Sequence, residues 1–372
     1  MSSRCYDLIV IGAGIIGTSC ADAAAAEGLR VAIVEPGPIG GGSTAAAMGH
    51  LVAMDDDPAE LALTRYSLHE WELFASLPEA EFSRCGTLWV ARNEAEARVI
   101  PARIARLGAA KVEAHAIDTQ NLYELEPALA PGLYGGLLVP REAVVYPPRM
   151  ALYLAQRAQS NGATLYAGRS ASKLGHAAGT DQVLLDDGTQ LSGPTLVATG
   201  CALPTLLPQL PMRARKGHLL ITERYPGVLH HQLLELGYAD SAHGDADSSV
   251  AFNVQPRPTG QILIGSSREF SATDSAVSPA MVRRMLERAF DFMPSLRQLQ
   301  ALRTWTGFRP TTPDGRPYLG AVPGQNKLWV AAGHEGLGVT TALGSARLML
   351  DLLLGRTPAI DPAPYAPSRV IA

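Results

Sequence analysis

The chain has 372 residues, of which 47% are hydrophobic and 18% charged, and a formal net charge of −4. These values predict a soluble globular protein of two lobes and argue against nucleic-acid binding. Cys5, Cys20, Cys85 and Cys201 are scattered without metal-ligand spacing. We therefore expect reduced thiols, no metal and a cytoplasmic location. We expect no secretory signal, because the first strand begins at about Asp7, and no transmembrane helix, because the apolar runs are shorter than the roughly 18 residues of a membrane span.

The N-terminal residues predict a βαβ unit. Leu8–Ile11 is a short apolar run, typical of a strand that is buried on both faces. The alanine-rich segment Ile15–Glu27 favours a helix, which Gly28 ends. Val31–Val34 then predicts a second buried strand, so the chain opens with strand, helix and strand.

The rest of the chain alternates between helical and strand patterns. Helices are expected at 58–77, 94–107, 149–161, 279–290 and 338–354, and strands at 163–167, 196–198, 218–222, 261–264 and 327–332. The alternating segment 183–191, with Asp186-Asp187-Gly188 at its centre, predicts a hairpin. The Pro-rich tail after Thr357 is expected to be a surface extension.

Parallel-type strands at both ends and in the middle, with antiparallel-type segments between them, predict an α/β fold. We expect a Rossmann-like nucleotide-binding domain, which the chain leaves and re-enters, with an inserted α+β domain built on an antiparallel sheet. The expected boundaries are 1–80, 141–211 and 306–372 for the nucleotide-binding domain, and 81–140 and 212–305 for the inserted domain.

The turn Gly12–Gly17 has the G-x-G-x-x-G pattern of dinucleotide-binding proteins. Gly12 permits a tight turn, Gly14 lets the backbone approach a pyrophosphate, and Gly17 lets the helix pack closely on the strand. The N-terminus of the helix would offer N–H groups to phosphates. Glu35, which closes the second strand, can accept both hydroxyls of a ribose and disfavours the 2′-phosphate of NADP. The alternative is a glycine turn with a purely structural role.

The segment from Gly40 to His50 consists mainly of small residues and favours FAD over NAD. Such a run lets the backbone lie along an extended dinucleotide towards a flavin. Ser43 and Thr44 can donate their hydroxyls to phosphate. The alternative is a flexible loop capped by Ser43.

Several separate motifs, in the same order along the chain, resemble the D-amino acid oxidase superfamily of flavoproteins from Asp7 to about Gly355. They are Gly12–Gly17, the loop Gly41–Gly49, Cys85-Gly86-Thr87-Leu88, Tyr146-Pro147-Pro148, Ala198-Thr199-Gly200, Lys216-Gly217-His218, Gly307–Gly315 and Gly333–Gly338. The likeness is greatest to the glycine oxidase and D-amino acid dehydrogenase branches. More finely, the chain resembles the FAD-bearing β subunit of heteromeric dehydrogenases such as D-hydroxyproline dehydrogenase, opine oxidase or hydrogen cyanide synthase.

This resemblance implies an FAD-dependent dehydrogenase. It would oxidise the C–N bond of a small amino acid or secondary amine, of the D-amino acid or D-hydroxyproline type, by hydride transfer to flavin N5 to give an imino acid. Its partners would be that substrate and either partner subunits or an electron-acceptor protein. A glycine- or sarcosine-type oxidase that uses O₂ and an electron-transfer flavoprotein subunit are the alternatives. The sequence leaves open the exact substrate, its stereochemistry and the oligomeric state.

The resemblance also assigns substrate-site residues. Arg309, in the block Gly307-Phe308-Arg309-Pro310, would hold the substrate carboxylate bidentately, because a guanidinium fork matches a carboxylate. An arginine that bridges the two domains is the alternative. Phe252 would supply an apolar wall. His50 and Glu335 would lie near the edge of the flavin ring, and for His50 a structural role is equally open.

The resemblance places the cofactor along six segments of the chain, with Ala171 meeting the adenine through its backbone. The FAD-binding positions are Gly12, Ala13, Gly14, Ile15, Ile16, Gly17, Glu35, Pro36, Ser43, Thr44, Ala47, Met48, Gly49, His50, Ala171, Ala198, Thr199, Gly200, Gly333, His334, Glu335, Gly336, Leu337, Gly338, Val339 and Thr340. The N–H groups of the last helix would face the N1–C2=O edge of the flavin, where negative charge develops on reduction. Alternatively, Gly336 and Gly338 merely permit tight packing.

Two departures from the family bear on the chemistry. Relatives with a covalent flavin use a cysteine beside the Arg-Pro block or a histidine at the position of Ala46, and this chain has neither. We therefore expect non-covalent FAD. Sarcosine oxidases carry an O₂-activating lysine in the strand that resembles Gln261–Gly265, where this chain has apolar residues. That difference favours a dehydrogenase.

Overall fold

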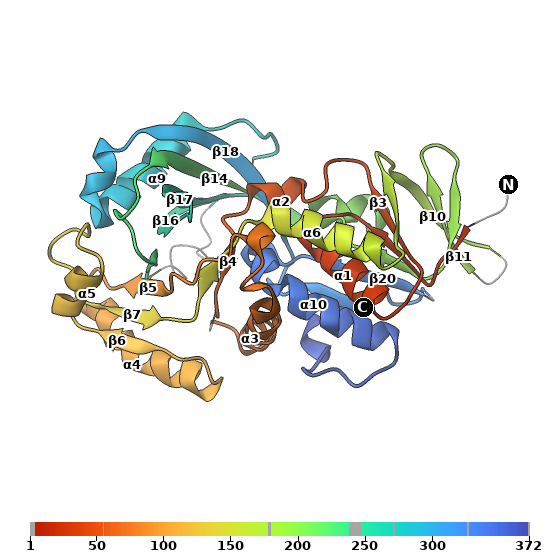
Figure 1. Cartoon of the computed structure of the whole chain (residues 1–372), viewed down its shortest axis with the longest axis horizontal. Helices are drawn as coiled ribbons and strands as arrows, with labels where there is room; N and C mark the ends of the chain where they lie inside the picture. Colours follow the sequence, from red (N-terminus) through yellow and green to blue (C-terminus); the bar gives the residue numbers. More distant parts are fainter. Residues whose placement is uncertain are drawn as a thin grey trace.

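The computed structural model describes residues 4–54, 56–177, 180–237, 247–270, 272–325 and 327–370. Figure 1 shows an elongated α/β molecule with one sheet-based lobe at each end and α2, α3 and β4 between them. In the described residues, no helix combines the length and apolarity that a membrane span requires.

The first lobe is built on a six-stranded sheet, parallel except for its edge strand β19. Its order is β19 (Tyr318–Ala321), β20 (Leu328–Ala332), β13 (Thr195–Val197), β2 (Leu8–Ile11), β3 (Val31–Glu35) and β9 (Thr164–Ala167). Successive side chains of β2 enter opposite cores, Leu8 and Val10 on one face and Ile9 and Ile11 on the other. This two-sided burial explains why the strand is uniformly apolar.

Different elements cover the two faces of this sheet. The helices α1 (Ile15–Ala26) and α10 (Gly338–Leu353) pack on the first face, and α6 (Pro147–Ser160) packs against α1. The second face meets α7 (Leu203–Leu206) and a small four-stranded sheet. That sheet has the order β1 (Arg4–Cys5), β12 (Gln190–Ser192), β11 (Thr180–Leu185) and β10 (Ala171–Ala177). The predicted hairpin is the antiparallel pair β11–β12.

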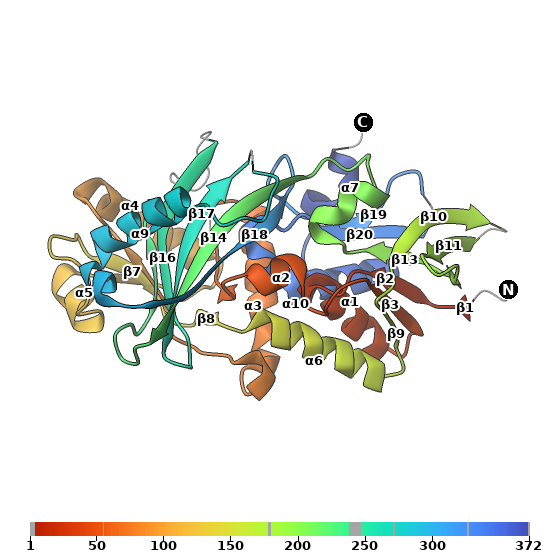
Figure 2. The same ribbon diagram turned by 90° about the horizontal axis from the view of Figure 1, so that it is seen from above.

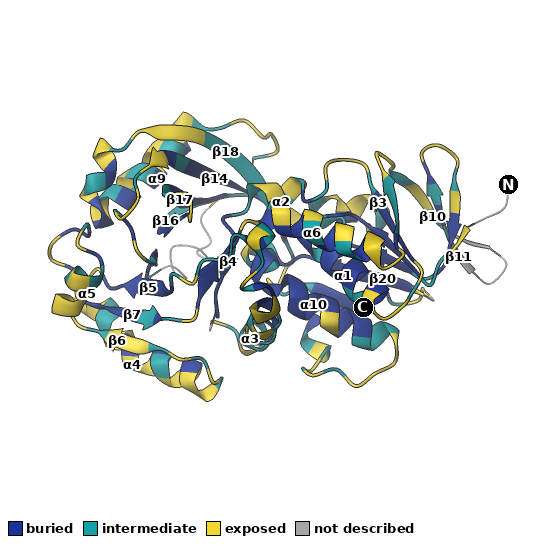
Figure 3. Cartoon of the chain, in the orientation of Figure 1, coloured by how far each residue is buried: buried dark blue, intermediate teal, exposed yellow. Residues whose placement is uncertain are grey.

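The second lobe is built on an eight-stranded sheet, antiparallel except for the pair β15–β5. Its order is β18 (Ala301–Thr311), β14 (Arg213–Arg224), β17 (Gln261–Glu269), β16 (Ser248–Pro256), β15 (Gln232–Glu235), β5 (Thr87–Val90), β7 (Gly136–Val139) and β6 (His115–Ile117). The helix α9 (Pro279–Phe292) covers it with Met281, Met285, Ala289 and Phe292, which share one helical face and are buried (Figure 3). The helices α4 (Glu94–Ala109) and α5 (Thr119–Leu125) lie near its far edge (Figure 1).

Capping residues account for two of the helix starts. Asp57 precedes α3 (Pro58–Trp71) and accepts hydrogen bonds from the N–H groups of Ala59 and Glu60. Ser278 caps α9 in the same way, and each helix has proline at its first position. Proline suits that position because its missing N–H would have no partner within the helix.

The long strands β14 and β18 extend from the second lobe towards the middle of the molecule (Figure 2). Residue pairs from Arg213↔Thr311 to Thr222↔Ala301 hold them together, and Thr311 also bridges to His334. Between the lobes lie the short helix α2 (Gly42–Ala46) and the two-stranded pair β4 (His50–Leu51) and β8 (Ala143–Val144). The expected boundary at 305/306 falls inside β18, so one continuous strand spans it.

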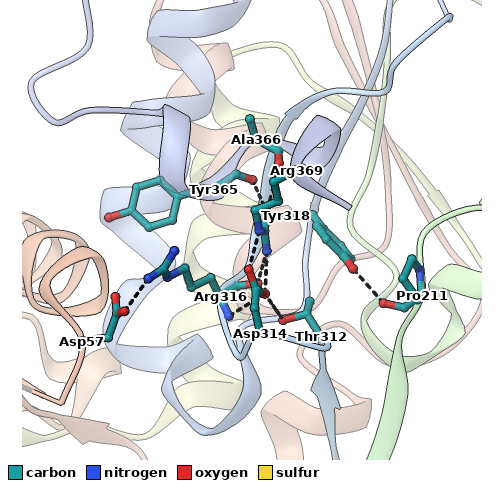
Figure 4. Close-up of polar contacts among 9 residues, drawn as sticks. All are labelled: Asp57, Pro211, Thr312, Asp314, Arg316, Tyr318, Tyr365, Ala366 and Arg369. Carbon is teal, nitrogen blue, oxygen red and sulfur yellow. Dashed lines mark hydrogen bonds and ion pairs between the residues drawn. The ribbon is translucent and has the colours of Figure 1, made fainter. Parts of the chain in front are cut away.

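The Pro-rich tail is packed rather than extended, contrary to the expectation from the sequence (Figure 4). Tyr365 is 1% exposed, and its hydroxyl donates to the Ala59 carbonyl at 2.5 Å. Arg369 pairs with Asp314 at 2.7 Å and donates to the carbonyls of Tyr365 and Arg316 at 2.8 and 2.5 Å. Short 3₁₀ turns, which tolerate proline at their starts, bring these side chains inward.

We predict that Arg369→Ala lowers the free energy of unfolding by about 2 kcal/mol, because it removes a charge-assisted pair and several hydrogen bonds. Thermal unfolding should show a fall in Tm of several degrees. Arg356→Ala is the matched control, because Arg356 pairs with Glu27 at 2.6 Å with 49% of its side chain exposed. Such an exposed pair contributes below about 1 kcal/mol. Equal losses for the two variants would contradict the anchoring role of Arg369.

Candidate functional site

A cavity of about 810 Å³ begins at the carboxyl ends of β2, β3, β13 and β20 and reaches the second lobe. At the first end it is lined by the loops that follow these strands, at Gly12–Ile16, Glu35–Pro36, Ala198–Gly200 and Gly333–Gly336. At the other end it is lined by side chains of the eight-stranded sheet, including Asn253, Arg268 and Arg309. Parallel α/β sheets bind ligands at this edge, so the predicted dinucleotide site and the predicted substrate residue share one cavity.

The fingerprint turn uses its three glycines in different ways. A Cβ on Gly17 would lie 1.9 Å from the Gly12 carbonyl oxygen, and one on Gly12, whose φ is +105°, would lie 2.5 Å from the Ala198 oxygen. These two glycines are required by the packing of strand, turn and helix. A Cβ on Gly14 would meet only the Thr44 hydroxyl, at 3.2 Å. Gly14 lines the cavity, so its missing side chain leaves room for a ligand.

The Glu35 carboxylate is fixed by backbone donors. The N–H of Ala13 donates to Oε2 and the N–H of Gly37 donates to Oε1, each at 2.7 Å. Each carboxylate oxygen keeps further acceptor capacity for the hydroxyls of a ribose. Ala13 thus lies behind the turn and orients Glu35, whereas Glu35 and Pro36 line the cavity.

Ser43 and Thr44 line the cavity, but both also hold the fold together. The Ser43 hydroxyl donates to the Phe308 carbonyl at 2.5 Å, which ties α2 to β18. The Thr44 hydroxyl oxygen accepts from the Ile15 N–H at 3.0 Å, so its own proton stays available to a ligand. Of the two hydroxyls that were expected to face phosphate, Thr44 therefore keeps that capacity.

The loop after α2 passes close to the second lobe. A Cβ on Gly307 would lie 2.3 Å from the Cβ of Ala46, and one on Gly265 would lie 2.8 Å from the Met48 sulfur. Gly49 has a φ of +87°, and a Cβ there would lie 2.1 Å from the Val145 oxygen. Glycine at these positions lets the small-residue segment line the cavity at Ala46–His50.

Two further features fit a bound dinucleotide. The Thr199 hydroxyl is buried without a hydrogen-bond partner among the described residues, although Thr199 lines the cavity. The N-terminus of α10 has no side-chain cap, and Gly338 and Val339 of its first turn line the cavity. An unpartnered hydroxyl and uncapped N–H groups both gain hydrogen bonds from a ligand. Ala171 lines the cavity at the start of β10.

His50 is held in a chain of amide side chains. Its Nδ1 contacts Gln232 Oε1, and its Nε2 lies 3.2 Å from the Asn253 side-chain nitrogen. Burial lowers the pKa of His50 to about 4 and outweighs the Gln232 contact, which raises it. The imidazole is therefore neutral at physiological pH and serves as a hydrogen-bonding group rather than a cation.

Glu335 lies among three arginines that adjacent strands supply. Arg215 of β14 donates to it at 3.2 Å and Arg268 of β17 lies 4.0 Å away, while Arg309 belongs to β18. Burial opposes ionisation of Glu335, but the charges of Arg268, Arg309 and Arg215 lower its pKa to about 2. Glu335 is thus an ionised carboxylate that organises guanidinium groups at the end of the cavity.

Arg309 is fixed at the cavity wall. Its Nη1 donates to the Ser267 carbonyl at 3.0 Å, and it packs over Gly217, where a Cβ would lie 2.5 Å from the same nitrogen. This contact explains the glycine in Lys216-Gly217-His218. Arg309 also lines the cavity.

A second cavity, of about 750 Å³, adjoins the first. The two share the lining residues His50, Asn253, Arg268, His334, Glu335 and Gly336. Leu337, predicted to bind the cofactor, lines only this second cavity. Its lining also includes Asp57, Asp314, Arg316 and Tyr365, which are drawn in Figure 4.

Phe252 corrects one expectation. It is fully buried and stacks on Phe292 with ring centroids 4.4 Å apart, inside the core of the second lobe. The next residue, Asn253, lines both cavities instead. Because successive strand residues face opposite sides, an error of one position exchanges core and site. The signal that was missed is Asn253 itself, a polar residue within the apolar run Ala251–Val254.

Three other predicted residues support the lining from behind. Gly17 permits the close helix packing, Ala13 orients Glu35, and the Thr340 hydroxyl donates to the His50 carbonyl at 2.8 Å. His334 lines the cavity, but its Nε2 contacts the Ser345 hydroxyl at 3.1 Å and burial lowers its pKa to about 3. The sequence did not single out Arg215, Arg268 or Leu219, because distant strands bring them together.

We predict opposite behaviour for two glycine variants of the turn. Gly17→Ala should lower the Tm of the cofactor-free protein, because its new Cβ cannot fit beside Gly12. Gly14→Ala should leave that Tm nearly unchanged but lower the content of FAD, the cofactor that the resemblance implies, because its Cβ would occupy the ligand's side of the turn. Thermal unfolding and flavin absorbance of the two proteins test this. A normal flavin content in Gly14→Ala would remove Gly14 from the binding surface.

Comparison with known proteins agrees with this geometry. The family described as FAD dependent oxidoreductase, DAO, matches residues 7–352. The glycine oxidase of Pseudomonas putida is 30% identical, with 97% of this chain and 98% of that protein covered. The hydrogen cyanide synthase subunit HcnC of Pseudomonas aeruginosa is 26% identical, with 99% of this chain and 97% of that protein covered. The crystal structure of glycine oxidase from Geobacillus kaustophilus superposes with a TM-score of 0.87 at 25% identity, covering 99% of both chains. The chain therefore belongs to the DAO family and is an FAD-dependent oxidoreductase of amines or amino acids.

Proposed function

We propose that this enzyme is a dehydrogenase that oxidises the C–N bond of a small amino acid or secondary amine, of the D-amino acid or D-hydroxyproline type. The observation that carries the proposal is Arg309, a fixed guanidinium in the wall of the cofactor cavity. A carboxylate is the natural partner of such a group. We also propose that residues 1–80, 141–211 and 306–372 form the FAD-binding domain and that residues 81–140 and 212–305 form the substrate-binding domain.

The side chains around Arg309 support the binding of a carboxylated amine. Glu335 remains ionised and draws Arg215 and Arg268 towards the same end of the cavity. His50, with its pKa lowered to about 4 by burial, adds no positive charge that would repel an ammonium group at neutral pH. The carboxylate thus has a cationic partner in Arg309, and the neutral His50 is available to the amine.

The residues of the site bind and orient, and they provide no dedicated base. FAD, when bound, supplies the hydride acceptor at N5. Arg309 fixes the carboxylate so that the Cα–H of the neutral amine faces the ring, and removal of hydride leaves an imino acid that water hydrolyses. When FAD is bound, the N-terminus of α10, which has no side-chain cap and lines the cavity at Gly338 and Val339, would stabilise the negative charge of the reduced flavin.

Non-covalent FAD is part of this proposal. The positions that carry a covalent flavin in relatives are Ala46 and the Gly307 block, and Ala46 and Gly307 pack directly on each other. The Cys201 thiol lines the cavity, but burial raises its pKa and keeps it protonated. We predict that acid precipitation releases all flavin into the supernatant. Flavin that stays with the pelleted polypeptide would refute this.

Arg309→Ala should lower kcat/KM for a carboxylated amine about tenfold to a hundredfold, because it removes a charge-assisted contact to the substrate. The FAD content should stay normal. Arg309→Lys keeps the charge but not the forked guanidinium, so its kcat/KM should lie between those of Arg309→Ala and the wild type. Arg283→Ala, which removes an exposed arginine of α9, is the control. Unchanged turnover of Arg309→Ala would exclude Arg309 from substrate binding.

We further propose that electrons leave through a partner subunit, an acceptor protein or a dye rather than efficiently to O₂. The support is β17, which has no lysine from Gln261 to Gly265. The names of the relatives favour an alternative, since the Pseudomonas putida protein is called a glycine oxidase. The geometry of Arg309 suits either acceptor, so only kinetics distinguishes them.

Stopped-flow reoxidation of the substrate-reduced enzyme decides between these acceptors. We predict that air-saturated buffer reoxidises the flavin much more slowly than an artificial dye does. Anaerobic bleaching with a panel of D-, L- and N-alkyl amino acids, cis-4-hydroxy-D-proline included, first identifies the reductant. Reoxidation by O₂ as fast as turnover with the dye would establish the oxidase. Absence of bleaching by every amine would point to an electron-transfer subunit.

A further inference from the structure

Asn253 occupies the boundary between the two cavities. It lines both of them, yet only 1% of its surface is exposed. One arm of its amide, the nitrogen, contacts His50 Nε2 at 3.2 Å. The other arm, Oδ1, is buried with no hydrogen-bond partner among the described residues. A buried acceptor of this kind is costly unless a ligand satisfies it.

A chain of hydrogen bonds determines which polar atom of the Asn253 amide has no hydrogen-bond partner among the described residues. The Gln232 side-chain nitrogen donates to the Thr87 hydroxyl at 2.6 Å, which leaves Gln232 Oε1 as the acceptor that faces His50. His50 therefore carries its proton on Nδ1 and donates it to Gln232. Because the ring is neutral, Nε2 has a bare lone pair, which accepts from the Asn253 nitrogen.

The end of this chain is an acceptor and not a donor. Rotation of the Asn253 amide would bring Oδ1 against the His50 lone pair, and two acceptors repel each other. The chain Thr87–Gln232–His50–Asn253 thus leaves the uncharged Oδ1 of Asn253, a residue that lines both cavities, as the acceptor without a partner among the described residues. Such a group binds N–H or O–H and disfavours ligand atoms that have only lone pairs.

We propose that Asn253 Oδ1 accepts a hydrogen bond from the N–H of the amine that is oxidised and thereby selects primary and secondary amines over tertiary ones. This assignment rests on the proposed function, in which Arg309 holds the carboxylate of the same substrate. An uncharged acceptor suits the reaction, because a carboxylate at this place would stabilise the ammonium form, whose nitrogen has no lone pair to support loss of hydride. Asn253 is thus a specificity-determining residue beside the charged groups.

Binding of two flat ring carboxylates tests the assignment without turnover. Pyrrole-2-carboxylate and furan-2-carboxylate have nearly the same shape, but the first carries a ring N–H and the second a ring oxygen with lone pairs only. Each is titrated into the FAD-loaded enzyme, and the change in flavin absorbance gives its Kd. We expect the wild type to bind the pyrrole acid about tenfold more tightly or better, the usual scale for loss of a partner by a buried polar group.

Variants of Asn253 separate recognition from structure. Asn253→Leu has a similar shape and no acceptor, so its preference for the pyrrole acid should fall to about onefold. Asn253→Asp keeps an acceptor and adds charge, so it should retain the preference while it binds both acids more weakly. Asn161→Leu is the matched control, because Asn161 is exposed at the end of α6. It should match the wild type.

The outcomes distinguish this assignment from the proposed function. Equal binding of the two acids by the wild type, or a preference that persists in Asn253→Leu, would overturn the role of Asn253 even if amines are oxidised. If Asn253→Leu loses its flavin, the preference in Asn253→Asp decides, and its loss there overturns the assignment. If the wild type binds neither acid, the assignment falls together with the carboxylate site at Arg309. Failure of every amine to bleach the flavin, with the pyrrole preference intact, would count against the proposed reaction alone.

Discussion

The Glu335 carboxylate, of whose side chain 16% is exposed, is the contact on which the centre of the molecule depends. Glu335 comes from the loop between β20 and α10 in the lobe of the six-stranded sheet, whereas the arginines around it come from three adjacent strands of the eight-stranded sheet. Removing one member of a buried ion pair costs about 3–5 kcal/mol, because the remaining charge loses its partner without regaining water. The network therefore links the two lobes at the end of the cavity. It also requires an unusual backbone, since Glu335 has a φ of +46°.

Small residues make this meeting of the lobes sterically feasible. Gly217 accommodates the guanidinium of Arg309, Gly307 accommodates Ala46, and Gly265 accommodates Met48. All three glycines belong to the strands that deliver the arginines. The sheet thus gives up side-chain packing at these positions so that charged and polar groups can reach the cavity. The motifs Lys216-Gly217-His218 and Gly307-Phe308-Arg309 record this steric requirement in the sequence.

A residue's role could be predicted from the sequence where the residues that it contacts lie close to it in the chain. The turn Gly12–Gly17 and the strand that ends at Glu35 could be predicted from local pattern, because the βαβ unit contains the packing of Gly17 on Gly12 and the hydrogen bond from Ala13 to Glu35. The contact of Gly12 with Ala198 comes from a distant part of the chain. The hydrogen bond from Ser43 that ties α2 to β18 was not predicted, because its acceptor Phe308 is distant in the chain. Phe252 and Asn253 are neighbours in β16 and lie on opposite faces of the sheet. Composition alone does not determine which of the two faces the core. The tail around Tyr365 was read as an extension because its turns have no helical or strand period.

The order of strands in the six-stranded sheet has a consequence for how the protein is made. The sheet places β2, near the start of the chain, next to β13, which in turn pairs with β20 near its end. Such long-range pairing gives a high contact order and slow folding. Because residues of Gly333–Gly338 line the cavity, a nascent chain cannot complete this cavity until β20 and α10 have left the ribosome. Cofactor binding then stabilises only the finished fold, and any chain that stalls earlier lacks that stabilisation and exposes the apolar strands of an open sheet.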